Sequence, residues 1–502
     1  MLEKIAVIEI DSIYVTMCVW EVENNKYYNL VKEFSHPIKL QEDIDESGFI
    51  KPNKNTLCNF ILKSFKIYCD KNEIKNIITY ARNFVKDIKN QNSFIDEIYN
   101  YVGLRVKILN SEEEVSYAYS ALVNTIDVSK GLFIDLSNSE TKFVFFNKKT
   151  ILDSYVLDEG ILSINKNLSL EDGKVDCDKV FEYFTKKLDN VEILKNVDQD
   201  TKIFVSGDAF NSAVKLCRKV SRYPIDLDHN YQITNSNMKD TFDLIKTLDV
   251  DKTKKIKGIS SDRADVLATS VSILYAITNK YSENLMHFSA YRLIDGVMFS
   301  NIKMDKEKPF FDMLENSLEN NMVFFSKNST NNKNILKTGL MLFSQLKVLH
   351  KLNKPFVKAF KIACILNDCG NRICYECSSS SAFDIVLKSK ILGVGQKEII
   401  LASFIVTCQN LEDLDLSTWM KYNQVLTEED LQAVRKLGVI LKLATYLDYR
   451  NFGLIQDISC DLLGDSVIIK TTPEGNIDYE LYSCKKIMLD FKRVFKKGLE
   501  VL

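Results

Sequence analysis

Charge of one sign is not in excess in this sequence. Its 66 Lys and Arg residues are matched by 68 Asp and Glu residues, which leaves a formal net charge of −2. A protein that binds nucleic acid over a broad surface usually carries a basic excess. The composition therefore predicts no nucleic-acid partner, although a local groove could still be positive.

Long apolar runs are missing as well. No run approaches the roughly 18 to 20 residues that are needed to cross a bilayer. The apolar start of the chain is interrupted by Glu9 and Asp11, and no small-residue cleavage site follows, so it does not resemble a signal peptide. The twelve cysteines form no regular framework, which favours reduced thiols. We expect a cytoplasmic protein without a membrane partner.

Strand-like and helix-like patterns alternate in the first half of the chain. Short β-branched segments in 4–36 are followed by a helix over 55–72, a strand over 75–79 and a helix over 93–102. This alternation predicts an α/β layer. With 502 residues, 46% of them hydrophobic, the chain can bury several cores, and we expect three or four domains.

The centre of this half is the segment 106–146. It predicts a strand over 106–109, an acidic helix start over 111–114, and a hairpin whose strands 131–136 and 141–146 flank the turn Ser137-Asn138-Ser139-Glu140. A carboxylate-rich helix start, followed by a strand that ends in Ile-Asp and a small polar turn, can hold a phosphate and a metal ion.

The acidic helix start has two interpretations. Ser111 and Glu114 have the spacing of a capping box, and acidic residues at a helix start stabilise the helix dipole. The alternative is a catalytic carboxylate. Asp135, at the end of a predicted buried strand, needs a partner, because an unpaired buried carboxylate is costly.

The second half of the chain reads as helical. A polar segment over 326–334 precedes amphipathic runs that begin at Ile335, Val357, Lys397 and Glu428. The last segment predicts two strands joined at 473–475 and then a helix.

Two motifs resemble those of a known family. LNSEEEVSYAY, followed about twenty residues later by GLFIDLSNSETKFVF, is similar to I-S-G-x-E-E-A-R-x-x-Y and V-I-D-I-G-G-G-S-T-E-L. These patterns are found in the exopolyphosphatase / guanosine pentaphosphate phosphohydrolase (Ppx/GppA) family. Further along, GISSDRADVLATSVSILYAI resembles I-x-x-x-R-A-D-x-x-x-x-G-x-x-I-L of the same family. The order and spacing match over nearly the whole chain.

The resemblance implies a fold and a domain plan. It implies a two-lobed actin-like (ribonuclease-H-like) ATPase fold of the α/β class, followed by an all-α HD-like helical domain and a small α/β C-terminal subdomain. The expected boundaries are 1–126 for lobe I, 127–302 for lobe II, 303–456 for the HD-like domain and 457–502 for the C-terminal subdomain.

The resemblance also implies a function. It implies Mg²⁺-dependent release of terminal phosphate from inorganic polyphosphate or guanosine pentaphosphate, with polyphosphate or guanosine penta- or tetraphosphate as partners of a homodimer. Glu113 aligns with the base that activates water in the family. Asp135 and Glu9 are the expected metal ligands, since Mg²⁺ usually takes one or two carboxylates. The expected phosphate-binding residues are Ser12, Arg82, Asn138, Ser139, Gly207 and Arg263.

The glycine turns of the family are replaced in this chain. Asp11 and Asp208 put negative charge where a phosphate oxygen should bind, and Lys142 replaces an acidic residue. Losing one preorganised donor typically costs roughly 10² to 10³ in rate. The alternative function is therefore a catalytically inactive member that acts as a ligand-binding or regulatory protein. A sugar-kinase-like ATP transferase is less expected, because its glycine turns are missing too.

The helical half resembles the HD motif in one segment only. AFKIACILNDCGNRI is similar to A-A-L-L-H-D-I-G, with Asn367 in place of the histidine. None of the chain's four histidines falls at a position of the HD pattern, so we expect no HD-type metal site. Four cysteines gather nearby, but two of them lie on an apolar helix, where free cysteine behaves as a small hydrophobe. We expect no zinc. These cysteines are Cys364, Cys369, Cys374 and Cys377.

Overall fold

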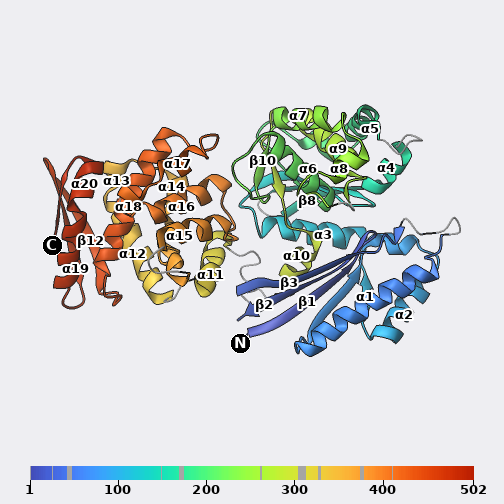
Figure 1. Cartoon of the computed structure of the whole chain (residues 1–502), viewed down its shortest axis with the longest axis horizontal. Coiled ribbons are helices and arrows are strands. Elements are labelled where there is room, and N and C mark those ends of the chain that lie inside the picture. The colour runs from blue at the N-terminus through green and yellow to red at the C-terminus, as the bar shows by residue number, and fades with distance from the viewer. Residues whose placement is uncertain are drawn as a thin grey trace. The chain divides into compact units, whose positions relative to one another are not determined.

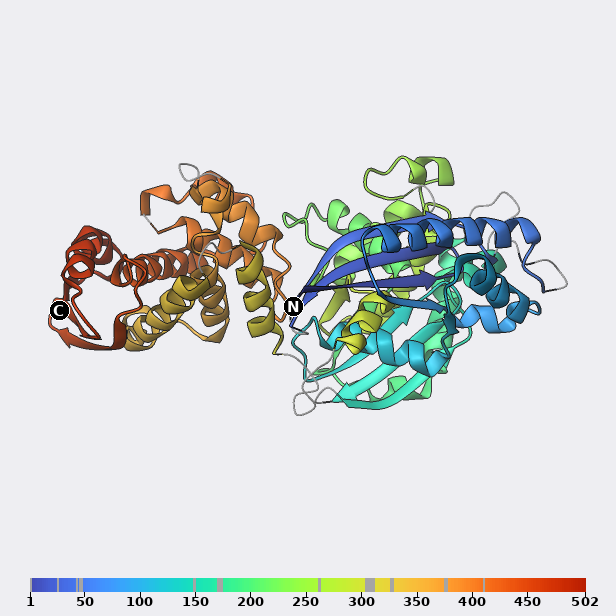
Figure 2. The same ribbon diagram turned by 90° about the horizontal axis from the view of Figure 1, so that it is seen from below.

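The computed structural model divides into two compact units, residues 1–311 and 312–502. Figures 1 and 2 show both units as ribbons, and each unit is described by itself. The four predicted domain boundaries stay predictions. The structure describes residues 2–24, 27–41, 44, 48–147, 150–168, 175–260, 263–302, 312–325, 329–373, 378–409 and 411–502.

The first lobe of unit 1 is built on a five-stranded sheet of order β3-β2-β1-β4-β5. β2 is antiparallel to both β1 and β3, whereas β4 is parallel to both β1 and β5. Helices α1 and α2 pack against each other beside this sheet. The elements are β1 (Leu2–Ile10), β2 (Tyr14–Glu23), β3 (Tyr27–Pro37), α1 (Pro52–Lys71), β4 (Asn76–Ala81), η2 (Asn83–Asp87), α2 (Gln91–Val102), β5 (Val106–Ile108), α3 (Ser111–Val123) and α10 (Leu293–Asn301).

The second lobe of unit 1 is built on a six-stranded sheet of order β10-β11-β9-β6-β7-β8. Its strands β6 and β7 are almost wholly buried, as their continuous apolar sequences require. The elements are β6 (Lys130–Leu136), β7 (Thr141–Asn147), β8 (Thr150–Leu157), α4 (Ile161–Leu168), α5 (Cys177–Asp189), η3 (Glu192–Asn196), β9 (Lys202–Ser206), α6 (Asp208–Val220), β10 (Tyr231–Ile233), α7 (Asn235–Ile245), α8 (Val250–Lys254), α9 (Leu267–Lys280) and β11 (Met286–Ser289).

Both sheets repeat one arrangement of strands. In each, three consecutive antiparallel strands (β1-β2-β3 and β6-β7-β8) are followed by a strand parallel to the first (β4 and β9). The turns after β1 and β6 and the segments after β4 and β9 therefore lie at the carboxyl ends of parallel strands. Ligands of α/β proteins bind outside such ends. The fold thus selects one edge of each sheet as the place to look for a site.

Unit 2 is mainly helical and ends in a small three-stranded sheet of order β12-β13-β14. Its α16 and α18 are largely buried, because apolar residues cover most of their surfaces. The elements are α11 (Met313–Phe325), α12 (Ser329–Gln345), α13 (Lys347–His350), α14 (Lys354–Ile365), η5 (Cys369–Arg372), α15 (Ser378–Lys388), α16 (Gln396–Thr407), η6 (Leu411–Asp413), α17 (Leu416–Met420), α18 (Glu428–Leu447), β12 (Ile455–Leu463), β13 (Ser466–Pro473), α19 (Asp478–Cys484), η7 (Lys485–Ile487), α20 (Met488–Phe495) and β14 (Gly498–Val501).

The position of the last hairpin differs from the prediction. β12 and β13 are joined at Gly464 and Asp465, where Leu463 pairs with Ser466, and not at 473–475. Gly464 has a φ of 51°, which a tight turn needs and glycine adopts freely. The Pro-Glu-Gly segment instead ends β13 before α19 begins. Proline lacks the N–H that would continue the ladder.

No described helix is long and apolar enough to span a bilayer. The two 20-residue helices, α1 and α18, are long enough but carry several charged side chains.

The crossing of α3 and α10 depends on a glycine. A Cβ atom at Gly296 would lie 1.8 Å from the carbonyl oxygen of Tyr117, so a larger residue must push the two helices apart. We expect Gly296→Ala to lower the free energy of unfolding of unit 1 by about 1–3 kcal/mol, the usual cost of overpacking. Denaturant unfolding followed by circular dichroism measures this change. The matched control is Ser300→Ala at the exposed end of α10, which should change stability by less than about 0.5 kcal/mol. Equal effects of the two substitutions would contradict the prediction.

Candidate functional site

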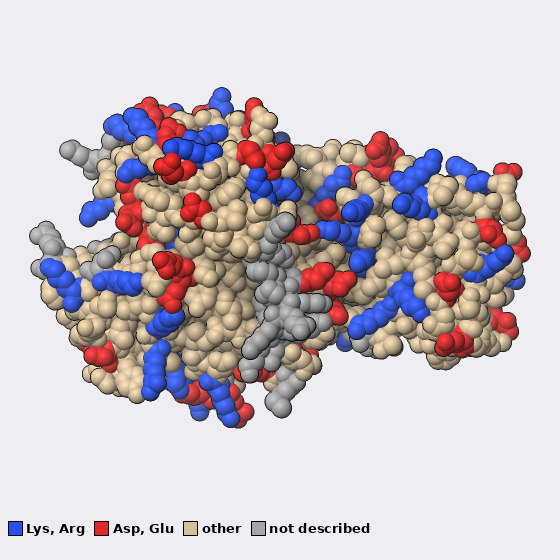
Figure 3. All heavy atoms as spheres, turned by 180° about the vertical axis from the view of Figure 1, so that it is seen from behind, with Lys and Arg blue, Asp and Glu red and all other residues tan. Residues whose placement is uncertain are grey.

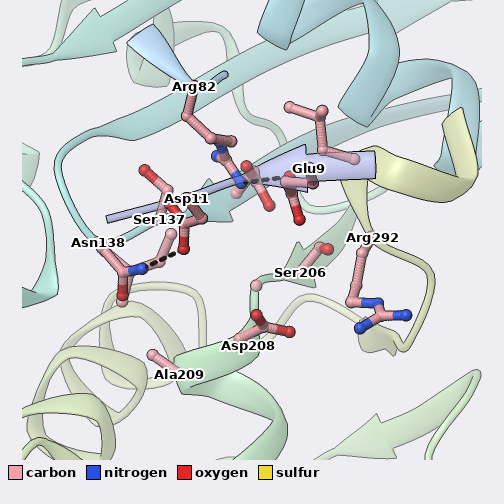
Figure 4. A pocket seen from close by; sticks show the side chains of 13 residues that line it. Glu9, Asp11, Arg82, Ser137, Asn138, Ser206, Asp208, Ala209 and Arg292 are labelled. Atoms are coloured by element: carbon pink, nitrogen blue, oxygen red, sulfur yellow. Dashed lines mark hydrogen bonds and ion pairs between the residues drawn. The ribbon is translucent and has the colours of Figure 1, made fainter. Parts of the chain in front are cut away.

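A small pocket lies where the carboxyl ends of β1, β4, β6 and β9 meet (Figure 4). Its free volume is about 30 Å³, room for roughly two water molecules. Four carboxylates and two guanidinium groups line it, so its surface is charged and crowded. The lining residues are Glu9, Asp11, Arg82, Asp135, Leu136, Ser137, Asn138, Ser206, Gly207, Asp208, Ala209, Arg292 and Leu293.

Glu9, the penultimate residue of β1, is the most perturbed acid of the pocket. Burial raises its pKa to about 7, although Arg82 lowers it. The Tyr80 hydroxyl donates a hydrogen bond to Glu9 Oε1 over 2.9 Å, and Arg82 Nη1 lies 3.5 Å from the same oxygen. The parallel register of β1 and β4, which pairs Glu9 with Tyr80, puts these groups side by side.

Asp11 and Asn138 connect the two lobes across the pocket. Asn138 Nδ2 donates a hydrogen bond of 2.6 Å to Asp11 Oδ2, and both residues are buried. Asp11 lies in the turn after β1, and Asn138 lies in the equivalent turn after β6. In a phosphate-binding pair of turns, backbone N–H groups would face a ligand here. In this chain two side chains fill that place.

Glu114 is a buried carboxylate behind the pocket. Its Oε2 lies 3.1 Å from Arg82 Nη2 and 2.9 Å from Lys142 Nζ, and its Oε1 accepts a 2.7 Å hydrogen bond from the Asn83 backbone N–H. Burial alone would raise the pKa of Glu114, but Arg82 and Lys142 outweigh it and hold the pKa at about 2. Glu114 is therefore ionised at every physiological pH.

Lys142, on β7, is fully buried and pairs with acids of both lobes. Its Nζ lies 2.9 Å from Glu114 of lobe I and 3.2 Å from Glu140 of lobe II. Burial alone would lower the pKa of Lys142, but the surrounding carboxylates, Glu114 above all, raise it. A buried lysine in this state must keep its partners, since a lone buried charge is costly.

Glu140 receives two further bonds from lobe I. Its Oε1 accepts hydrogen bonds from Asn83 Nδ2 over 2.7 Å and from Ser111 Oγ over 3.0 Å. We call the five residues Asn83, Ser111, Glu114, Glu140 and Lys142 the inter-lobe network. Together with the Asp11–Asn138 bond, it ties the lobes on two sides of the pocket.

Comparison with known proteins identifies the group to which this fold belongs. Residues 18–305 match the family model described as Ppx/GppA phosphatase family, which is more than half of the chain. The chain belongs to the Ppx/GppA phosphatase family. No curated protein matched the sequence.

Solved Ppx/GppA structures share the fold of this family member. The Ppx/GppA protein of Aquifex aeolicus is 21% identical, with a TM-score of 0.53, over 60% of this chain and 98% of that one. An exopolyphosphatase of Cytophaga hutchinsonii is 18% identical, with a TM-score of 0.54, over 60% and 98%. The predicted actin-like fold is therefore confirmed. The HD-like assignment of the helical half stays a prediction.

Glu113, the expected catalytic base, is not among the lining residues of the pocket, and its catalytic role stays a prediction. Asn110, not Ser111, caps α3, and Glu113 is the acidic partner in that capping box. The Glu113 side chain is about one-third exposed and pairs with Lys107, whose hydrogen bond lowers its pKa. The carboxylate that faces inward is Glu114, one residue later.

A helical pattern could have indicated Glu114. It lies on the same stripe as Ala118, Ala121 and Leu122, at spacings of four, seven and eight residues, and these residues are buried. A carboxylate on the apolar face of a helix needs a buried cation. If the capping box is placed one residue earlier, at Asn110 and Glu113, the pattern predicts Glu113 at the surface and Glu114 in the interior.

The other predicted site residues divide into two groups. Glu9, Arg82, Asp135, Asn138 and Gly207 line the pocket, whereas Ser12, Ser139 and Arg263 are not among its lining residues. Their roles in binding stay predictions.

Two predicted site residues, Arg263 and Gly207, affect the pocket through the residues that they contact. Arg263 Nη2 lies 3.0 Å from Asp208 Oδ2 and so holds an acid at the rim of the pocket. Gly207 has a φ of 124°, and a Cβ atom there would lie 2.1 Å from the Leu136 carbonyl oxygen. The close approach of two strands therefore requires this glycine.

Arg292, which precedes α10, lines the pocket and was missed in the sequence. The segment SAYRLIDGV resembles a further motif of the family, S-x-x-G-L-R-E-G-V. That motif has its arginine where this chain has Ile294, two residues after Arg292. Arg292 Nη1 lies 2.9 Å from Glu33 of β3. An arginine in a loop belongs to no helical or strand periodicity. Its position follows only from the fold, in which the chain passes from β11 of lobe II to α10 of lobe I.

The expected magnesium site stays a prediction. Among the described residues, no group of three or more His, Cys, Asp or Glu side chains is arranged to hold a metal ion. Glu9 and Asp11 already bond to Tyr80 and Asn138. Burial raises the pKa of Asp135, against the effect of Lys142 and Arg82, which disfavours the charged form that a cation needs.

In unit 2, the segment that resembles the HD motif is bonded by the amide side chain of an asparagine. Asn332 Nδ2 donates to Asp368 Oδ1 over 2.8 Å and to the Ile365 carbonyl over 2.7 Å. Cys364 and Cys369 are buried. Cys374 and Cys377 lie outside the described residues, so the absence of zinc stays a prediction.

We expect Lys142→Met to destabilise unit 1 by about 3 kcal/mol or more, because it leaves Glu114 and Glu140 short of a buried cation. Lys130→Met is the matched control. Lys130 lies on the neighbouring strand and pairs with Asp198 at the surface, where an ion pair is worth about 0–1 kcal/mol. Denaturant unfolding measures both changes. Adding Glu114→Gln to Lys142→Met should recover part of the loss, and an equal loss for the two lysine variants would refute the buried pairing.

The titration of Glu9 predicts a pH dependence of stability. The folded state keeps the Glu9 proton up to about pH 7, whereas the unfolded chain releases it near its ordinary pKa of 4.5. Folding therefore takes up a proton between these values, and the contribution of Glu9 to stability falls as the pH rises from about 4.5 to 7. We expect Glu9→Gln to remove this fall and to be more stable than the unsubstituted protein at pH 8 by about 1–3 kcal/mol.

Urea unfolding at pH 5, 6, 7 and 8 tests this prediction. Glu112→Gln, at the exposed start of α3, is the control and should follow the unsubstituted protein at each pH. A Glu9→Gln variant with an unchanged pH profile would show that Glu9 is ionised throughout.

Proposed function

We propose that this Ppx/GppA family member binds a phosphorylated ligand without hydrolysing it and responds by opening its two lobes. The expected ligands are inorganic polyphosphate and guanosine penta- or tetraphosphate. The observation that carries the proposal is the 2.6 Å hydrogen bond between Asn138 and Asp11, which occupies the space between the two turns. A phosphate that enters this space has to break the bond, so ligand binding and lobe opening are coupled.

Three features of the pocket argue against turnover. The hydrogen bond between Asn138 and Asp11 occupies the space between the two turns, where a phosphate and an attacking water would have to lie. Glu114 has a pKa of about 2, whereas a general base works best when its pKa lies near the operating pH. The carboxylates of Asp11 and Asp208 add negative charge at turn positions where the family has glycine. Stabilisation of a developing oxyanion, often the largest single contribution to catalysis, is lost.

Two guanidinium groups still favour an anion. Arg82 and Arg292 both line the pocket, and their present partners are carboxylates that an incoming phosphate could replace. Arginine binds phosphate in a bidentate manner, which makes each replacement favourable. No step of the proposal passes through a metal.

Residual hydrolysis is the second candidate function, and one observation favours it. Glu9 lines the pocket with a pKa of about 7, where a carboxylate can act as a general acid or base at neutral pH. The Cytophaga hutchinsonii protein that shares the fold is an exopolyphosphatase. In this case Glu9, rather than Glu113, would receive the proton of the attacking water.

We expect no phosphate release from long-chain polyphosphate or guanosine pentaphosphate, with or without Mg²⁺, together with a rise in the melting temperature of unit 1. A ligand at 100 times its Kd stabilises the folded state by about 2.7 kcal/mol. Phosphate release is followed with a colorimetric phosphate assay, and melting by calorimetry. Asn138→Ala should strengthen ligand binding because it removes the Asp11 bond, and Asn301→Ala on α10 is the surface control.

The two candidate functions give opposite results. Phosphate release that disappears in Glu9→Gln would establish hydrolysis and overturn the proposal. Neither phosphate release nor thermal stabilisation by either ligand would remove both phosphate functions.

A further inference from the structure

Unit 2 carries a row of exposed aromatic rings that the phosphate pocket does not involve. Four rings at the end of α18 and on α19 are between 43% and 64% exposed, a high value for large apolar side chains. A fifth, Tyr446, lies one turn earlier on α18 and is partly buried. We call Tyr446, Tyr449, Phe452, Tyr479 and Tyr482 the aromatic row.

The rings of the aromatic row are spaced like a stacking platform. The ring centroids of Tyr446 and Tyr449 lie 6.0 Å apart, and those of Tyr449 and Tyr479 lie 5.6 Å apart. Tyr479 and Tyr482 are three residues apart on α19, so their side chains leave the same face of the helix. The row therefore continues from α18 onto α19.

Cations accompany four of the five rings. The amino group of Lys442 lies 5.1 Å from the Tyr446 ring, and the guanidinium of Arg450 lies 5.2 Å from the Phe452 ring. The amino groups of Lys486 and Lys485 lie 5.8 Å from the Tyr449 ring and 5.9 Å from the Tyr482 ring. Each distance is within the range of a cation–π contact.

Acidic side chains near the aromatic row are already engaged. Glu480 is buried and forms a 2.7 Å ion pair with Arg450. Asp478 accepts a hydrogen bond from Asn476, and Asp490 pairs with Arg493.

Free positive charge remains beside the rings. Residues 431–447 of α18 contain no acid. Within the described part of the chain, Lys485 and Lys486 are exposed and form no ion pair. Figure 3 shows Lys and Arg side chains, with acidic side chains between them, on one face of unit 2, at the right of the view.

We infer that the aromatic row binds single-stranded nucleic acid. Proteins that bind single strands combine aromatic rings, on which bases stack, with cations that follow the phosphates. A protein partner fits less well, because lysine is depleted at protein interfaces, whereas lysines flank three of these rings. The neutral composition of the whole chain speaks against a broad nucleic-acid surface but not against a local one. The inference is independent of the proposed function, since its residues all lie in unit 2.

A binding titration with the full chain tests the inference. The probes are a fluorescein-labelled 15-nucleotide oligo(U), the corresponding duplex, and unlabelled polyphosphate as a base-free competitor, with binding followed by fluorescence anisotropy. We expect the single strand to bind more tightly than the duplex, with affinity that falls as salt rises. Tyr449→Ala/Tyr482→Ala should weaken binding at least tenfold, since base–aromatic stacking supports roughly 5- to 100-fold per base. Tyr449→Phe/Tyr482→Phe should keep binding, because the rings remain.

Two further variants separate stacking from general charge effects. Lys485→Glu/Lys486→Glu should weaken binding and reduce its salt dependence, whereas Tyr101→Ala, a still more exposed ring on α2 of unit 1, should change nothing. Equal binding of duplex and single strand, or full competition by polyphosphate at equal phosphate concentration, would overturn base recognition. Alanine variants that leave oligo(U) binding intact but change the oligomeric state would assign the row to a protein interface instead. Circular dichroism of each variant excludes unfolding as the cause of any loss.

Discussion

The ion pairs of a fully buried lysine set the geometry of unit 1. Lys142 lies on β7 of lobe II, while its nearest acidic partner, Glu114, belongs to α3 of lobe I, so separating the lobes would break their 2.9 Å ion pair. Weakening such a pair leaves a poorly compensated charge in a medium of low polarity. The contact between the lobes is therefore stabilised by electrostatic pairing as well as by apolar burial. Arg82 extends the same network to Glu9 and hence to the pocket.

The charges of the pocket also explain why its acids differ so much from each other. Glu9 and Glu114 both contact Arg82, yet the pKa of Glu9 is raised to about 7 and that of Glu114 is lowered to about 2. Glu114 has two cations and a backbone donor around it, whereas Glu9 shares one guanidinium with neighbouring acids. A single shared arginine thus maintains two protonation states within one site. Such a separation is usual at functional sites, although structural ion-pair networks produce it too.

Much of the fold could be predicted from the sequence, because strand and helix periodicities are local properties. The hairpin around Ser137 and the helix that begins at Ser111 lie where alternation and the acidic helix start predict them. The site was harder to predict. Glu113 and Glu114 differ by one residue, and that choice depends on which residue caps α3 and on a lysine 28 residues away. Arg292 reaches the pocket only through the return of the chain from lobe II, which no local pattern records.

Gly207 shows how packing alone can require a glycine of a family motif. Its positive φ and the carbonyl of Leu136, which would lie 2.1 Å from a Cβ atom, exclude every other residue on steric grounds alone. A stable sheet is then sufficient to require this glycine, whether or not the protein acts on phosphate. Asp11 and Asp208 lie at turn positions where no such close contact excludes a side chain, so residues other than glycine are tolerated there. Glycines kept by crowding and glycines kept by catalysis look identical in a sequence alignment, and only the space around each one distinguishes them.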